Sequence, residues 1–163
     1  MTAHELFCIL PDPDATEAFA QRLAQVVEAG DTLLLHGPVG AGKSALSRAL
    51  ITALRHSGGL PPEDVPSPTF TLVQTYDVDG FEVWHADLYR LSGPDGVVEL
   101  GLDEAFGTAL CLVEWPDRLG SDRPANAIDI SLSYLDGGGR RLTLTGPPDA
   151  IDRLRPVFAK DLP

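Results

Sequence analysis

The segment Gly37–Ser44, which reads GPVGAGKS, constrains the fold of this chain more than any other stretch. It fits the pattern G-x-x-x-x-G-K-[ST], in which glycines let the backbone turn so that successive N–H groups point into one concavity. Three leucines precede the segment, and apolar side chains at helical spacing follow it, namely Leu46, Ala49, Leu50 and Ala53. The order of strand, phosphate-binding loop and helix predicts an α/β fold of the P-loop NTPase type. A glycine-rich turn without a ligand is the alternative.

The residue types of this phosphate loop predict how a nucleotide would be held. Lys43 is expected to reach the outer phosphates, and Ser44 to offer its hydroxyl to a magnesium ion. The start of the following helix adds a partial positive charge that suits phosphate. Further contacts are expected from Gly37, Pro38, Val39, Gly40, Ala41, Gly42 and Ala45.

Length and charge limit what the rest of the chain can be. A chain of 163 residues with 44% hydrophobic content can bury one good core, so residues 1–163 are expected to form one domain. The 12 basic residues against 24 acidic ones give a formal net charge of -12. Binding to a nucleic-acid backbone depends on basic side chains, so this balance argues against a chain that holds nucleic acid alone. It fits a protein with a less acidic partner.

The two cysteines, Cys8 and Cys111, both lie in apolar runs typical of strands. Buried thiols in a reducing compartment are the simplest interpretation. The N-terminus has no basic region before its short apolar run, and no stretch approaches the length of a membrane span. We therefore expect a cytoplasmic protein with no membrane association.

Two acidic residues follow predicted strands. Five apolar residues, Ala109–Val113, predict a central strand buried on both faces, and Glu114 closes it beside the phosphate loop. A charge there is costly to bury alone, so magnesium is its expected partner, with a solvent-facing carboxylate as the alternative. Trp115 is expected either to line the nucleotide pocket or to pack in the core. Asp87, which ends a second strand, is a candidate for orienting a metal-bound or attacking water.

The loop before the predicted strand at 70–76 carries two hydroxyls. Ser67 and Thr69 lie in a loop stiffened by prolines, where a segment that senses the terminal phosphate would be expected. The alternative is an ordinary start of a strand. Residues 70–76 and 81–87 then predict a hairpin through the turn Asp77–Gly80.

The remaining elements complete a mostly parallel central sheet with antiparallel edge strands and flanking helices. We expect a strand over Glu5–Leu10, a helix over Ala15–Glu28 with Thr16 in its first turn, and a terminal helix over 149–159 that Pro156 interrupts. Residues 126–134 and 140–145 predict an antiparallel hairpin at the sheet edge. The charges of Arg140 and Arg141 at its turn are expected to be solvated.

Four motifs in this order resemble the TsaE (YjeE) family of small bacterial ATPases needed for threonylcarbamoyladenosine synthesis in tRNA. They are the phosphate loop, SPTFTLV from Ser67, HADLYRL from His85, and EWP from Glu114. The resemblance implies that Lys43 and Ser44 hold the phosphates and magnesium of ATP or ADP, and that Glu114 is the second protein contact to the metal. It also implies a switch loop with Ser67 and Thr69, and Asp87 as the carboxylate that positions or activates water.

The resemblance implies further contacts and partners. Thr16 and Arg140 match family residues that approach the nucleotide, while Pro38-Val39, Ser44 and Ala20 depart from the family pattern without removing a needed donor. Family members work with the proteins TsaD and TsaB, so the chain is expected to meet tRNA only indirectly, through a complex that its hydrolysis resets. No arginine is in an obvious position to act as an arginine finger, so slow turnover that partners stimulate is expected.

Two other functions remain open from the sequence. The first is a small-molecule P-loop kinase, although the connection from Ser57 to Pro66 is short for a substrate lid. The second is a nucleotide-sensing subunit that switches between partners without hydrolysis. The base is expected to be adenine, because no N-K-x-D sequence for reading guanine accompanies either D-x-x-G sequence, at Asp77 and at Asp117.

Overall fold

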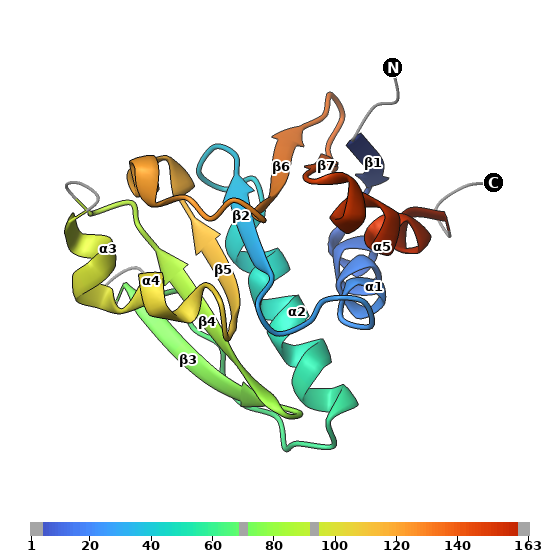
Figure 1. Cartoon of the computed structure of the whole chain (residues 1–163). Helices are drawn as coiled ribbons and strands as arrows, with labels where there is room; N and C mark the ends of the chain where they lie inside the picture. The colour runs from blue at the N-terminus through green and yellow to red at the C-terminus, as the bar shows by residue number, and fades with distance from the viewer. Residues whose placement is uncertain (1–4, 69–71, 92–94, 160–163) are drawn as a thin grey trace.

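The computed structural model describes residues 5–68, 72–91 and 95–159 (Figure 1). In these ranges the strands form one seven-stranded sheet in the order β1-β7-β6-β2-β5-β4-β3. The neighbours β6, β2, β5 and β4 pair in parallel, whereas β3 on one side and β7 and β1 on the other are added antiparallel. The predicted α/β fold with a mostly parallel centre is therefore confirmed. The strands are β1 (Glu5–Leu10), β2 (Thr32–His36), β3 (Val73–Val78), β4 (Phe81–Asp87), β5 (Leu110–Glu114), β6 (Ile128–Tyr134) and β7 (Arg140–Thr145).

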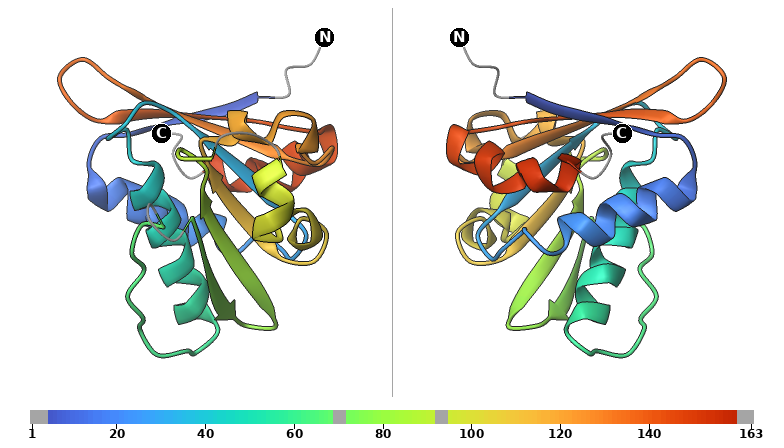
Figure 2. Two further views of the ribbon diagram at one scale, coloured as in Figure 1. Left: turned by 90° about the vertical axis from the view of Figure 1, so that its left-hand side faces the viewer. Right: turned by 90° about the vertical axis from the view of Figure 1, so that its right-hand side faces the viewer.

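Helices cover the sheet on two sides (Figure 2). Alternation along β2 sends Leu33 and Leu35 into a core with α1, α2 and α5, and sends Leu34 into a second core with α3, α4 and the 3-10 helix η1. All five residues of β5 are buried, as predicted for a central strand. The helices are α1 (Pro13–Leu23), α2 (Lys43–Ser57), α3 (Asp95–Leu100), α4 (Leu102–Ala105), η1 (Pro116–Asp122) and α5 (Pro148–Ala159).

The carboxyl ends of three parallel strands align in one row. Glu114 at the end of β5 pairs in register with Leu35 of β2 on one side and with Asp87 of β4 on the other. The phosphate loop begins two residues after Leu35, at Gly37. Both predicted carboxylates therefore lie beside the loop.

Two predictions about the N-terminal half and the sheet edge were wrong. Helix α1 starts at Pro13 with Asp12 as its N-cap, and it ends at Leu23 rather than at residue 28. After this end, the carbonyl of Val26 accepts a hydrogen bond of 2.7 Å from Arg153 of α5 instead of continuing a helical ladder. The β6–β7 hairpin is not at the edge, because β6 pairs with β2 and β1 adds outside β7.

The other predicted elements stand close to their expected bounds. The hairpin of β3 and β4 forms as predicted. The prediction that Pro156 interrupts the terminal helix was wrong, because Pro156 lies inside α5, which continues to Ala159. Cys8 and Cys111 are both buried, and burial raises the pKa of the Cys111 thiol to about 12. Within the described part of the chain, every helix is too short or too polar to cross a bilayer.

Candidate active site

The phosphate loop makes a tight turn between β2 and α2. Gly37 has a φ of 146°, and a Cβ atom there would lie 2.6 Å from the carbonyl oxygen of Leu132. Gly42, with a φ of 107°, caps the N-terminus of α2. Because glycine brings no side chain to cap the helix, the first N–H groups of α2 are available to an anion.

The β6–β7 hairpin holds the outer side of this loop. The Tyr134 hydroxyl donates to the Val39 carbonyl at 2.7 Å, and Arg140 donates to the carbonyls of Ala41 at 3.1 Å and Gly40 at 3.3 Å. Since these carbonyls are drawn toward the hairpin, the turn can aim its N–H groups at a ligand. The position of Arg140 after the turn predicted a solvated charge. This prediction was wrong, because the guanidinium donates to the loop carbonyls.

Lys43 lies at the base of the loop and is almost fully buried, with 5% of its surface exposed. Its ammonium donates to the carbonyl of Gly37 and lies 3.9 Å from the centre of the Trp115 ring. Burial lowers the pKa of Lys43, although the negative charges of Glu114 and Asp87 act in the opposite direction. The ammonium is thus held next to the loop, where the cost of burying its charge outweighs the attraction of the nearby carboxylates.

Ser44 and Glu114 form the pair that fits a magnesium ion. The Ser44 hydroxyl lies 3.0 Å from both carboxylate oxygens of Glu114, whose surface is 3% exposed. Hydroxyl and carboxylate oxygens are the hard donors that magnesium prefers. No group of three or more His, Cys, Asp or Glu side chains suited to a metal occurs among the residues that the structure describes. A cation here would take its other ligands from water and phosphate.

Asp87 stands beside this pair on the neighbouring strand and is buried. Its carboxylate accepts a hydrogen bond of 3.0 Å from the backbone N–H of Tyr89. The Tyr89 ring packs against Trp115, with their centres 4.8 Å apart. Tyr89, just after β4, therefore holds the Asp87 carboxylate through its backbone and packs against Trp115 through its ring.

The predicted site residues are distributed over two adjoining hollows. The phosphate hollow, of about 440 Å³, is lined among others by Lys43, Ser44, Ser67, Asp87, Glu114 and Trp115. The α1–α2 groove, of about 850 Å³, is lined among others by Thr16, Ala41 and Arg140. Gly42 and Ala45 line both, and Val39 and Gly40 line only the first. Gly37 and Pro38 belong to the loop without lining either hollow, and Thr69 lies outside the described residues.

Comparison with known proteins identifies the family. The model of the family described as "Threonylcarbamoyl adenosine biosynthesis protein TsaE" matches residues 10–142. This chain belongs to the TsaE family. It is 35% identical over 159 residues to the tRNA threonylcarbamoyladenosine biosynthesis protein TsaE of Rickettsia felis, covering 94% of this chain and 91% of that protein.

Relatives from other bacteria agree with the TsaE assignment. The Bacillus subtilis protein named TsaE is 33% identical over 144 residues, which cover 88% of this chain and 87% of the relative. The crystal structure of Bacillus subtilis YdiB superposes with a TM-score of 0.78 at 26% identity, covering 98% of this chain and 97% of that one. The TsaE fold thus extends over nearly the whole chain.

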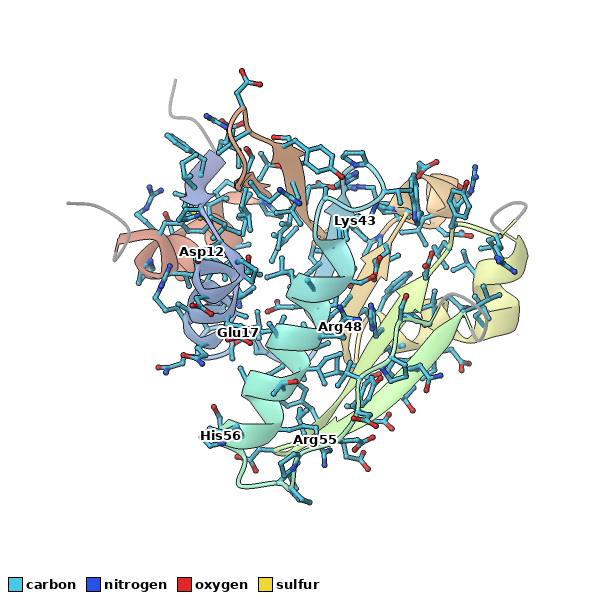
Figure 3. The ribbon with its side chains drawn as sticks, turned by 180° about the vertical axis from the view of Figure 1, so that it is seen from behind. Asp12, Glu17, Lys43, Arg48, Arg55 and His56 are labelled. Carbon is cyan, nitrogen blue, oxygen red and sulfur yellow. The ribbon has the colours of Figure 1, made fainter. Side chains whose placement is uncertain are left out.

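Two side chains at this TsaE site were not assigned from the sequence. Arg48 lines both hollows, so an arginine of the chain does stand near the phosphate loop (Figure 3). Its spacing of one helical turn after Ser44 is the signal that places it on the same side of α2. His85 lies two residues before Asp87 on β4, which puts both side chains on one face of the sheet.

Proposed function

We propose that this chain is a magnesium-dependent ATPase that acts in the threonylcarbamoyladenosine modification of tRNA. The observation that carries the proposal is the contact of 3.0 Å between the Ser44 hydroxyl and the buried Glu114 carboxylate, directly after Lys43. A hydroxyl that follows the loop lysine and an acid at a strand end are the two protein groups that hold magnesium in P-loop NTPases. The pathway comes from the TsaE family, whose relatives in Rickettsia felis and Bacillus subtilis carry its name.

The two hollows match the two ends of ATP. We place the triphosphate in the phosphate hollow, where the loop N–H groups and Lys43 supply positive charge. The base and ribose then lie in the α1–α2 groove near Thr16, because Gly42 and Ala45 line both hollows and connect them. Four of the residues that line this groove are labelled in Figure 3, namely Asp12, the N-cap of α1, Glu17 of α1, and Arg48 and His56 of α2.

Hydrolysis in this arrangement depends on positioning and on charge. A magnesium ion held by Ser44 and Glu114 would neutralise phosphate oxygens when bound. Lys43 compensates the charge that develops on the terminal phosphate, and Asp87 orients the attacking water and accepts its proton. Ser67, which lines the phosphate hollow, and Thr69 act as the segment that responds to the terminal phosphate.

We further propose that TsaD and TsaB are the protein partners, that tRNA is reached only through them, and that ATP hydrolysis resets their complex. The mouth of the site supports docking of a protein there. Val39 and Tyr89, which line the phosphate hollow, have 75% and 51% of their surfaces exposed, and Tyr134, which donates to the Val39 carbonyl, has 52% exposed. Apolar rims of this kind favour protein contact, and a partner that covers them excludes water from the phosphates. The isolated chain should therefore turn over slowly.

The test measures ATP hydrolysis and ADP binding in variants of Asp87. Asp87→Asn should abolish release of phosphate from ATP and leave ADP affinity within about twofold, because the amide cannot accept the water's proton. Asp103→Asn, an exposed change in α4, serves as the control and should behave as wild type. Hydrolysis that survives in Asp87→Asn contradicts the role of Asp87. Transfer of labelled phosphate to a metabolite instead of water would identify a kinase, and full biological activity of Asp87→Ala would identify a non-hydrolytic sensor.

A further inference from the structure

His85 lies beneath the Ser44–Glu114 pair and is completely buried, with 0% of its surface exposed. Its Nε2 atom is 2.7 Å from Oε2 of Glu114. A carboxylate can only accept hydrogen bonds, so Nε2 carries the hydrogen and donates it. The imidazole is therefore a direct partner of the carboxylate that faces Ser44.

The other ring nitrogen, Nδ1, indicates that the role of the imidazole is its hydrogen bond to Glu114. Nδ1 of His85 is buried and has no hydrogen-bond partner among the described residues. Burying a polar atom without a partner costs free energy, and an aliphatic side chain would fill the same space without that cost. The one hydrogen bond that the ring makes within the described chain is the bond to Glu114.

Two donors fix the orientation of the Glu114 carboxylate. Ser44 approaches both oxygens from the phosphate hollow, whereas His85 approaches Oε2 from inside the sheet. If the Ser44 oxygen turns toward a cation, its hydroxyl no longer donates the present hydrogen bond to Glu114. His85 then remains as the described donor that holds the carboxylate in place.

We propose that His85 is a positioning residue that orients the Glu114 carboxylate for the magnesium ion of the bound nucleotide. The inference rests on the proposed function, because it needs magnesium to strengthen nucleotide binding. Removing a group that orients a metal ligand typically costs about 10-fold to 100-fold in metal affinity. The loss should therefore appear in the magnesium-dependent part of nucleotide affinity and not in the magnesium-free part.

The experiment measures the dissociation constant of ADP with magnesium and with EDTA, and takes the ratio of the two. His85→Leu should lower the gain from magnesium by about 10-fold or more, with the EDTA value within about twofold of wild type. His85→Gln, whose side-chain amide can reach Oε2, should restore most of the gain. The matched control is Leu112→Ala, since Leu112 is the register partner of His85 on β5, is buried, and makes no side-chain hydrogen bond.

The outcomes separate this inference from the proposed function. If magnesium does not strengthen ADP binding in wild type, the proposed function fails, and the role of His85 fails with it. If wild type responds to magnesium and His85→Leu responds equally, only the role of His85 is refuted, as it also is if Leu112→Ala loses the same gain. Should His85→Leu not fold, His85→Asn replaces it. The shorter amide of Asn should lose the gain that Gln keeps, and equal gains in the two variants overturn the proposal.

Discussion

Replacement of Gly37 by alanine tests the backbone of the phosphate loop most directly. The φ of 146° suits glycine, and holding another residue in such a region costs about 1–3 kcal/mol. The new Cβ would also lie 2.6 Å from the Leu132 carbonyl oxygen, and overpacking of this kind costs about 1–3 kcal/mol. Reduced entropy of the unfolded chain returns about 0.4–1 kcal/mol. The net loss of unfolding free energy should be about 1–6 kcal/mol, a large share of the stability of an ordinary domain.

Gly59→Ala is the matched control for this change. Gly59 also has a positive φ, of 71°, but a Cβ atom there would meet nothing within 4 Å. An alanine there therefore carries the smaller cost of the left-handed region and meets no collision. In urea unfolding followed by circular dichroism, the Gly37→Ala midpoint should lie below the Gly59→Ala midpoint by on the order of 1 M. Equal midpoints would refute the close approach of loop and β6.

Lys43, Asp129 and Trp115 each support a further measurement. Burial lowers the pKa of Lys43 and bound phosphate would raise it again, so ADP binding should take up protons at alkaline pH. Calorimetry in buffers of different ionisation enthalpy measures this uptake, and its persistence in Lys43→Ala would contradict the assignment. Asp129 lies in β6 and accepts hydrogen bonds from Arg123 and from His36 of β2. Burial raises the pKa of Asp129, but these hydrogen bonds outweigh it, so the net pKa is lowered. The stability that Asp129 provides is present above its unfolded pKa of about 4, and is lost as pH falls through the lower folded value. Asp129→Asn should flatten the acid side of the plot of unfolding free energy against pH, and an unchanged slope argues against this cluster. Because Trp115 lines the phosphate hollow, Trp115→Phe should abolish the fluorescence response to ADP and Trp84→Phe should keep it. The opposite pattern would place the ligand elsewhere.

Local patterns were sufficient to predict the centre of the sheet and its carboxylates. The apolar run before Glu114 predicted the buried strand β5, and the turn at Asp77–Gly80 predicted the β3–β4 hairpin. Both signals lie within a few consecutive residues, where burial and turn geometry act directly on the sequence. The phosphate loop belongs to the same class of local signal.

Long-range pairing could not be predicted in the same way. The position of β1 outside β7 joins Glu5 to Thr145, and nothing in either strand alone specifies that register. Beyond the early end of α1, the Val26 carbonyl accepts a hydrogen bond from Arg153, which lies 127 residues later in the chain. Arg140 looked like a solvated turn residue because its loop carbonyl partners lie about 100 residues earlier, which sequence spacing cannot reveal.

The central claim is that the loop N–H groups, Lys43 and the Ser44–Glu114 pair together bind a nucleotide and its magnesium. Equilibrium titration of ADP into wild type, Lys43→Ala and Glu114→Ala, with magnesium and with EDTA, tests it most directly. Lys43→Ala should weaken binding by about 10-fold or more in both conditions, since it deletes a charge-assisted contact worth about 1.5–3 kcal/mol. Glu114→Ala should lose the gain from magnesium and keep its affinity in EDTA. Binding by both variants that matches wild type in both conditions would contradict the account.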